Sequence, residues 1–255
     1  MLEIWKTQVR PLTGRKLRKV YVYVPDEAME NPEARFPVLY MFDGHNVFLD
    51  SEATYGKSWG MKDYMDATGT PMIIVGVDCD HSPDNGRLSE YSPFSFEAPG
   101  IGRITGRGKL FMDWVCGRLK PMIDKRYPTI RDREHTWIAG SSMGGLMTIY
   151  AVTAYNEVFS KGVALSPSVW VAPKRLDEMI EKSEMAADTV LYMNYGSREM
   201  SNHEGMAAKY YRAVNTLAKK NIMLTSRIVP NGDHCEACWE QEIPIFMPVL
   251  HFERE

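Results

Sequence analysis

The sequence predicts an α/β fold in which a mostly parallel central sheet is flanked by helices. Short apolar runs rich in β-branched and aromatic residues recur along the chain, as expected for strands buried on both faces. Amphipathic helical patterns lie between these runs, and this alternation is typical of βαβ units. The length of 255 residues and the hydrophobic content of 44% suit one large domain. We therefore expect residues 1–255 to form a single α/β domain.

Seven runs are predicted to form strands. The first alternates valine with tyrosine, which indicates a strand whose two faces differ. Most of the later runs are apolar throughout, as a parallel sheet covered on both faces requires. In chain order, the predicted strands are residues 20–24, 37–42, 72–77, 136–139, 162–165, 190–193 and 222–229.

Three helices are predicted from the spacing of apolar residues. Residues 109–125 carry an apolar stripe at helical spacing, and Pro121 removes one backbone donor within it, which predicts a kink or an early break. Residues 146–155 and 203–219 also have helical patterns. By contrast, residues 80–107 are dense in Gly, Pro, Ser and Asp and have no sustained period. We expect this stretch to be a long loop excursion at the mouth of the sheet, where loops are often functional.

A G-x-S-x-G motif at residues 140–144 indicates a nucleophilic serine. The motif follows the predicted strand 136–139 and precedes the predicted helix 146–155, which is the setting of the nucleophile elbow in α/β-hydrolases. Ser142 would then lie exposed at the strand end, close to a helix N-terminus whose N–H groups favour negative charge. The alternative is a glycine-rich turn whose serines cap a helix. The flanking elements favour the nucleophile.

The general base is expected after the serine, because α/β-hydrolase triads run Ser, acid, His along the chain. His203, His234 and His251 satisfy this order. His234 lies in a turn-like N-G-D-H segment just after the predicted strand 222–229, where the base should be found. His251 is close to the chain end, and no equally well placed acid precedes His203. We predict that His234 is the base.

The acid of the triad is predicted to be Glu199, which follows the strand 190–193 closely. A carboxylate there can hold the imidazole tautomer and stabilise the imidazolium. Glu204 is the nearer rival, whereas Asp188 precedes the same strand and should lie at the wrong end of the sheet. Asp233 is adjacent to the histidine in sequence, and neighbouring side chains seldom face each other productively.

An oxyanion hole needs two backbone N–H groups aimed at the developing charge. Met143, the residue after the nucleophile, is expected to supply one of them. The other should come from the loop after an early strand, where residues 42–46 read F-D-G-H-N. Either His45 or Asn46 could supply this N–H. Loss of one such donor typically costs about 2.7–4 kcal/mol of transition-state stabilisation.

Together these segments resemble the esterase branch of the α/β-hydrolases, which includes esterase D, feruloyl and acetylxylan esterases, mycolyltransferases and siderophore esterases. The likeness is greatest to siderophore-esterase-like hydrolases and spans about residues 20–239. It rests on residues 40–48 (YMFDGHNVF), 87–93 (RLSEYSP), 119–127 (LKPMIDKRY) and 140–145 (GSSMGG), and on His234 with Trp239. The resemblance implies that Ser142 is the nucleophile and His234 the base, and it makes Pro121 a family feature. Glu199 rests more on its position than on a motif.

The sequence therefore predicts a serine esterase that forms an acyl-enzyme and needs no cofactor. Its substrate would be a small acyl ester, such as an acylated sugar, a feruloyl or acetyl ester or a siderophore-type lactone. An acyltransferase with the same triad is a close variant, because only the second nucleophile differs. A non-catalytic binding protein on the same fold is a further alternative.

Substrate contacts are assigned to Arg87, Tyr91 and Trp170. Arginines of the 80–107 excursion would meet an acidic or catecholate substrate, and its aromatic residues would stack on a ring. The equally weighted alternative is that these residues are solvated charges and packed loop or core residues.

Composition excludes several other classes. The formal net charge is −3 with no basic stripe, which disfavours nucleic acid as a partner, and no apolar stretch is long enough to span a bilayer. We expect a cytoplasmic protein, because no signal peptide is apparent. Cys235 and Cys238 form a C-x-x-C, but no second pair completes a zinc site, so no metal is predicted. The oligomeric state stays open, with a homo-oligomer among the alternatives.

Overall fold

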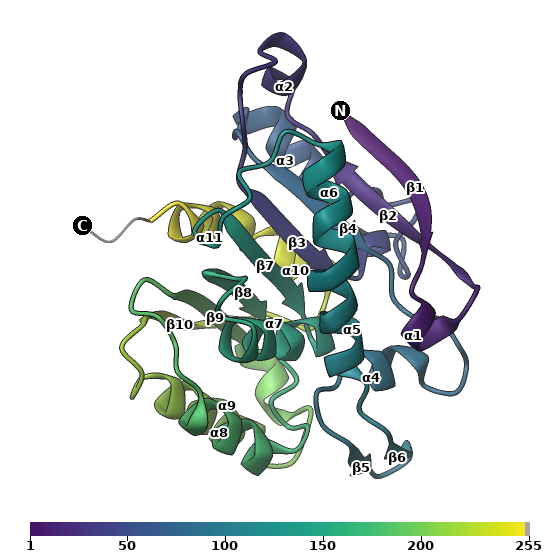
Figure 1. Ribbon diagram of the computed structural model, residues 1–255. Helices are drawn as coiled ribbons and strands as arrows, with labels where there is room; N and C mark the ends of the chain where they lie inside the picture. Colours follow the sequence, from purple (N-terminus) through teal and green to yellow (C-terminus); the bar gives the residue numbers. More distant parts are fainter. Residues whose placement is uncertain (253–255) are drawn as a thin grey trace.

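The computed structural model describes residues 1–252 and contains one eight-stranded sheet that runs through the molecule (Figure 1). The strand order is β1-β2-β4-β3-β7-β8-β9-β10. β1–β2 and β2–β4 are antiparallel, and all the other neighbours are parallel. The strands are β1 (Leu2–Gln8), β2 (Leu17–Tyr23), β3 (Val38–Phe42), β4 (Ile73–Val77), β7 (Thr136–Ser141), β8 (Lys161–Leu165), β9 (Val190–Gly196) and β10 (Met223–Val229).

The seven predicted strands are all present, with ends shifted by up to three residues. Of the eight strands in this sheet, β1 is the one that the sequence analysis missed. It pairs with β2 at one edge of the sheet, and its side chains are mostly half-buried or exposed. An edge strand with charges on it lacks the continuous apolar run that marks a central strand.

The side chains of β3 show why the central strands read as uninterrupted apolar runs. Val38, Tyr40 and Phe42 belong to one apolar cluster, and Leu39 and Met41 belong to the other. Successive side chains of a strand point to opposite faces of the sheet. Because both faces are covered by helices, every residue of β3 is buried.

Helices cover both faces of the sheet (Figure 1). Residues of α5, α6, α7, α8 and α9 belong to the larger apolar cluster, and residues of α3, α10 and α11 to the smaller one. The helices are α1 (Arg10–Thr13), α2 (Glu27–Glu30), α3 (Met61–Thr68), α4 (Gly86–Glu90), α5 (Gly108–Trp114), α6 (Lys120–Arg126), α7 (Met143–Ala154), α8 (Pro173–Lys182), α9 (Met206–Leu217), α10 (Glu236–Glu240) and α11 (Ile243–Leu250).

The predicted helix 109–125 is confirmed as a helical run over residues 108–126. The run is not uniform, because a π-helical segment, Val115–Leu119, joins α5 to α6. Pro121 stands just after this segment, at the start of α6. Its missing N–H leaves one carbonyl of the preceding turn without its usual partner. The π-helical segment lies where this mismatch occurs and lets the helical run continue.

The 80–107 excursion is more ordered than its composition indicated. It contains α4 and a small hairpin of β5 (Phe96–Ala98) and β6 (Gly102–Ile104). A buried ion pair, in which Arg18 Nη1 lies 2.5 Å from Glu90 Oε1, joins α4 to strand β2. The prediction of an irregular loop was therefore wrong in part, because short elements here are stabilised by tertiary contacts.

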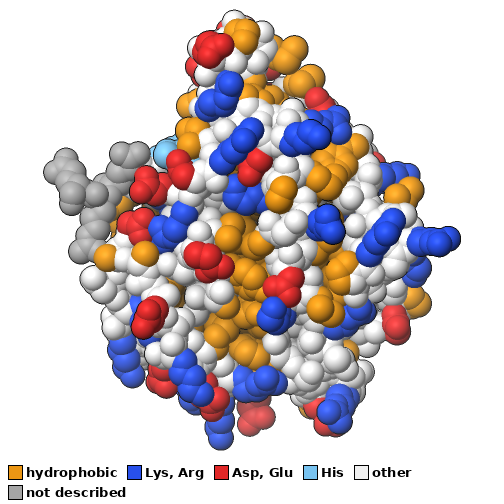
Figure 2. Space-filling model, in the orientation of Figure 1, with side chains coloured by type: hydrophobic (Ala, Val, Ile, Leu, Met, Phe, Trp, Pro, Cys, Tyr) orange, Lys and Arg blue, Asp and Glu red, His pale blue; other side chains and the backbone are white. Residues whose placement is uncertain are grey.

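Within residues 1–252, none of the helices has both the length and the apolar character needed to cross a bilayer. On the face shown in Figure 2, Lys and Arg side chains are intermingled with Asp and Glu around an apolar central band. This face carries no continuous basic patch.

The packing of α11 leads to a first test of the fold. Phe246 is fully buried against the sheet, whereas its neighbour Ile245 is 40% exposed. We expect Phe246→Ala to lower the free energy of unfolding by about 3–5 kcal/mol, because it leaves a cavity. The control Ile245→Ala should stay within about 0.5 kcal/mol of the wild type. Urea unfolding measures both, and equal losses would contradict the assigned burial.

Candidate active site

The carboxyl ends of the parallel strands gather chemically active residues at one edge of the sheet. Asp43 follows β3, Ser142 follows β7 and Ser166 follows β8. All three adopt positive φ although none is glycine, with values of 54°, 58° and 44°. Such backbone conformations are costly and concentrate at functional sites. This edge therefore holds the candidate active site.

Ser142 occupies a sharp turn between β7 and α7. Its backbone has φ 58° and ψ −121°, and its N–H donates to Leu165 O at 2.9 Å. The turn packs closely against β3: a Cβ on Gly144 would lie 2.9 Å from Phe42 Cβ. A side chain at this position would push the turn away from the sheet. The structure therefore has the strand–turn–helix geometry that the motif predicted.

Near the turn, the backbone N–H groups of Met143 and His45 have no acceptor among residues 1–252. Asn46 N–H instead donates to Asp43 O at 2.8 Å. The Asn46 side chain donates from Nδ2 to Glu236 Oε1 at 3.2 Å, and burial raises the pKa of Glu236. The sequence left His45 and Asn46 as alternatives for the second oxyanion donor. Of these two, His45 is the one whose N–H has no acceptor among residues 1–252.

Glu199 and His234 form a close pair. Glu199 Oε2 lies 2.5 Å from His234 Nδ1, and the glutamate side chain is 1% exposed. Glu199 Oε1 accepts from Gly196 N–H at 2.9 Å. A Cβ on Gly196 would lie 2.3 Å from Gly232 O, so glycine allows the β9 and β10 loops to approach. The approach of the two loops brings Glu199 and His234 together, although they are far apart in sequence.

Ser166 is a residue of this site that the sequence analysis missed. Its hydroxyl donates to Glu199 Oε1 at 2.7 Å and accepts from Trp239 Nε1 at 3.0 Å. The Trp239 ring packs edge-on against His234, with centroids 5.1 Å apart and planes at 81°. Ser166 thus links the acid to the residue that packs on the histidine. Its one sequence signal was its position directly after a core strand.

The Ser142 hydroxyl is not hydrogen-bonded to His234 in this structure. Its Oγ lies 3.5 Å from Ser168 Oγ, on the loop that follows β8. Ser168 N–H also donates to Ser142 O at 3.0 Å. Catalytic hydrogen bonds are often long in ligand-free structures and tighten when substrate binds.

The alternative acids are exposed or paired with arginines. Glu204 is exposed. Asp188 pairs with Arg133 at 2.6 Å, before β9 begins. Asp233 pairs with Arg198 at 3.0 Å, where both side chains are at least half exposed.

The alternative histidines contact other aromatic rings. His203 is exposed and stacks on Trp170 with a centroid distance of 4.3 Å, and burial of its ring contributes most to lowering its pKa. His251 packs edge-on against Trp137 at 5.2 Å. His234 is therefore the histidine that carries a buried carboxylate partner.

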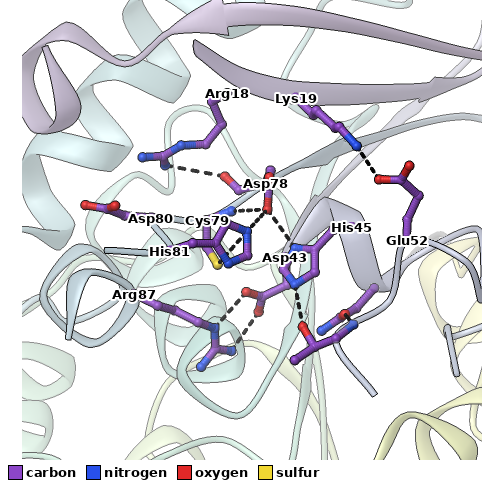
Figure 3. Close-up of polar contacts among 12 residues, drawn as sticks. Arg18, Lys19, Asp43, His45, Glu52, Asp78, Cys79, Asp80, His81 and Arg87 are labelled. Atoms are coloured by element: carbon purple, nitrogen blue, oxygen red, sulfur yellow. Dashed lines mark hydrogen bonds and ion pairs between the residues drawn. The ribbon is translucent and has the colours of Figure 1, made fainter. Parts of the chain in front are cut away.

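The predicted substrate contacts need correction. Tyr91 is fully buried, packs on Phe42 and accepts a hydrogen bond from Asp43 N–H at 3.1 Å, so it is a core residue. Arg87 is engaged by Asp43 in two hydrogen bonds of 2.7 Å each (Figure 3). Burial opposes its charge, but Asp43 outweighs this effect and raises the pKa of Arg87. Trp170 is partly exposed and keeps its place as a candidate contact.

The C-x-x-C thiols are free and lie beside the histidine loop. Cys238 Sγ accepts from Asp233 N–H at 3.3 Å, and burial raises the pKa of the Cys238 thiol. Cys235 lies at the start of α10. The pair helps to close the turn that carries His234.

The strand order, the sharp serine turn and the Glu199–His234 pair at the carboxyl edge define an α/β-hydrolase. The model of the family described as "Putative esterase" matches residues 13–244. The chain belongs to this family of esterases. Family and relatives together support carboxylic ester hydrolysis as the reaction of the chain.

Three relatives illustrate the similarity. The ferri-bacillibactin esterase BesA of Bacillus subtilis is 24% identical over 96% of this chain and 86% of its own length. The iron(III) salmochelin esterase of Escherichia coli is 28% identical over 66% of this chain, but over 36% of its own length. The solved structure of an IroE-like serine hydrolase from Shewanella oneidensis superimposes with a TM-score of 0.75 at 19% identity, covering 98% of this chain and 79% of that one.

The contacts of Ser166 lead to a prediction for the stability of the site. We expect Ser166→Ala to lower the free energy of unfolding by about 1–3 kcal/mol, because Trp239 Nε1 loses its acceptor and buried Glu199 loses one donor. Ser201→Ala, at an exposed serine, should change it by less than about 0.5 kcal/mol. Denaturant unfolding measures both variants. An unchanged stability in Ser166→Ala would show that this hydroxyl carries no structural role.

Proposed function

We propose that the protein is a serine carboxylic-ester hydrolase in which Ser142, His234 and Glu199 form a catalytic triad. The strained conformation of Ser142, at the edge where the Glu199–His234 pair lies, is the observation that carries the proposal. A serine hydroxyl is a weak nucleophile and needs an adjacent base. The base in turn needs a group that orients it, and buried Glu199 meets this need.

In the proposed first step, His234 accepts the proton of Ser142 Oγ while the oxygen attacks the ester carbonyl carbon. Because Glu199 engages Nδ1, the proton would go to Nε2. The resulting imidazolium is stabilised by the Glu199 carboxylate. His234 then protonates the leaving alcohol, and an acyl group stays on Ser142. Water, deprotonated by His234, attacks this acyl-enzyme and releases the carboxylic acid.

The negative charge of the tetrahedral intermediate would be held by the N–H groups of Met143 and His45. Their free donors support this assignment. Met143 also begins α7, whose N-terminus favours negative charge. Arg87 makes a bidentate contact with Asp43, the residue just before the turn Gly44–Asn46, and so holds this turn in place. Arg87 would therefore act on the oxyanion loop and not on the substrate.

We propose small acyl esters as the substrate class, with siderophore-type lactones and feruloyl esters as the leading candidates. Relatives named for ferri-bacillibactin and salmochelin support the first candidate. Aromatic side chains near Ser166, on the loop that follows β8, suit an acyl group that carries a ring. Trp170 lies four residues after Ser166, packs edge-on against Phe96 at 5.7 Å and stacks on His203.

The nucleophile is tested with p-nitrophenyl esters from acetate to octanoate. We expect the wild type to hydrolyse part of the series, with a chain-length preference that reports the size of the acyl site. Ser142→Ala should lower kcat by roughly 10⁴-fold or more, because no other group can form the acyl-enzyme. Ser51→Ala, at an exposed loop serine, serves as the control.

A fluorophosphonate probe provides a second readout that needs no turnover. It should label the wild type and Ser51→Ala covalently, and leave Ser142→Ala unlabelled. Turnover that survives in Ser142→Ala would exclude this serine as the nucleophile. If the wild type hydrolyses none of the series yet is labelled, acylated sugars and siderophore lactones are the substrates to measure next.

The acid is tested by a matched pair of amide substitutions. Glu199→Gln keeps the size of the side chain but removes the charge that stabilises the imidazolium, and we expect kcat to fall by roughly 10⁴-fold. Asp233→Asn removes the carboxylate next to His234 in sequence, whose contact is the exposed Arg198. Its kcat should stay within a few-fold of the wild type. The reverse pattern would reassign the acid to Asp233.

A further inference from the structure

A second cluster of chemically active side chains lies beside the oxyanion loop, at the carboxyl ends of β3 and β4 (Figure 3). His45 comes from the 3-10 turn Gly44–Asn46, and Asp78, Cys79 and His81 come from the segment after β4. One nitrogen, oxygen or sulfur atom from each of the four lies within 4.8 Å of the others. None of the four side chains has a role in the proposed triad.

His45 is held so that one ring nitrogen faces Asp78. The residue is 7% exposed, and its Nε2 lies 2.9 Å from Thr54 Oγ1. Its Nδ1 lies 2.7 Å from Asp78 Oδ1, yet the two are not aligned as a hydrogen bond, and Nδ1 has no other partner. This nitrogen therefore points into the polar cluster, at ion-pair distance from a carboxylate.

A metal ion bound here would replace the proton that lies between His45 Nδ1 and Asp78 Oδ1. When Nε2–H donates to Thr54, Nδ1 of the neutral ring carries a lone pair. In the other tautomer Nδ1 donates to Asp78, so the ring binds a metal ion when the proton lies on Nε2. Histidine ligands of metals commonly donate their other ring N–H to a nearby oxygen, and Thr54 Oγ1, 2.9 Å from Nε2, is placed to accept such a bond from His45.

The neighbouring cationic side chains do not pair with the Asp78 carboxylate, because each has a carboxylate partner of its own. The close contacts of the Asp78 carboxylate are the two histidines, with His81 Nε2 at 2.7 Å, and the Cys79 N–H at 2.8 Å. The neighbouring pairs are Arg18 with Glu90, Arg87 with Asp43, and Lys19 with Glu52.

The cluster is open to solvent on one side. His81 is 58% exposed, whereas Cys79 lies at the bottom and is 3% exposed. A cavity of about 300 Å³ is lined by residues of this segment, including Asp78, Cys79, Asp80 and His81. An ion can therefore enter from the side of His81, and the exposed imidazole is free to rotate toward it.

We propose that His45, Asp78, Cys79 and His81 bind one Zn²⁺. Two imidazole nitrogens, one carboxylate oxygen and one thiolate sulfur form a donor set that suits zinc and disfavours Mg²⁺ and Ca²⁺. In a tetrahedral zinc site, ligand atoms lie about 3.3–3.6 Å apart. Cys79 Sγ and His81 Nε2 lie 4.0 Å apart, whereas each histidine nitrogen lies 2.7 Å from Asp78 Oδ1, so the side chains of Asp78 and His81 both have to rotate to complete the set. Binding releases the thiol proton of Cys79 to solvent.

This ion would add a further link between two segments that already lie in contact, the 3-10 turn after β3 and the loop after β4. Because His45 also carries one of the free N–H groups, zinc would brace the loop that faces the serine turn. The proposed zinc site does not depend on the proposed esterase activity. Its test therefore uses binding and spectra.

Zinc binding is measured by calorimetric titration of the chelator-treated full chain with ZnCl₂. We expect one Zn²⁺ per chain, and a thermal unfolding midpoint that rises with zinc. His81→Ala and Asp78→Asn should each weaken binding by at least about 100-fold. The matched control is His135→Ala, because His135 also pairs with an aspartate three residues away, Asp132, at 2.7 Å. This control should bind zinc as the wild type does.

Cobalt substitution tests the thiolate ligand separately. Co²⁺ bound to the wild type should show a thiolate-to-cobalt charge-transfer band, which Cys79→Ser should lack. Circular dichroism establishes that each variant is folded, and surface-exposed His81 makes His81→Ala the least disruptive of them. Absence of zinc binding by the wild type, or equal affinity in His81→Ala, would overturn the proposal. A band that persists in Cys79→Ser would overturn the four-ligand assignment.

Discussion

The site depends on one constraint, the parallel alignment of the neighbouring strands β4, β3, β7, β8, β9 and β10. Parallel strands deliver their carboxyl ends to one edge of a sheet, so residues far apart in sequence meet there without a special arrangement of the loops. Ser142 reaches this edge from β7, Glu199 from β9 and His234 from β10. Backbone contacts then set their spacing. Gly144 against Phe42 and Gly196 against Gly232 both need the absence of a side chain.

Buried carboxylates at this edge are tolerated because each one accepts hydrogen bonds from nearby donors. An uncompensated buried charge would cost several kcal/mol, so such groups persist when they are paired or hydrogen-bonded. Glu199 receives hydrogen bonds from Ser166 and Gly196 besides its contact with His234. Glu242 accepts from Tyr192 at 2.7 Å and Asn194 at 2.9 Å and pairs with Arg227. The strand that leads to the acid is thereby held by polar contacts as well as by apolar packing.

Local patterns in the sequence predicted the central strands and the helix after Ser142. They also predicted that Ser142, Glu199 and His234 each follow the end of a strand. What sequence reasoning missed depends on contacts between distant segments. Ser166 looks like any loop serine until β8 and β9 are placed side by side. Tyr91 was misassigned because a Gly- and Pro-rich stretch indicates an exposed loop, whereas this stretch is folded back onto the core. The approach of His45 to the segment after β4 likewise exists only in three dimensions.

Trp239 gives the histidine loop a built-in optical signal. Its indole ring contacts the imidazole of His234 edge-on, and its N–H is fixed on Ser166. Because emission of an indole responds to nearby charge, a change in the charge of this imidazole is reported by the tryptophan itself. Proton transfer at the histidine can therefore be followed in the unlabelled protein, on the time scale of fluorescence detection and without a chromogenic leaving group.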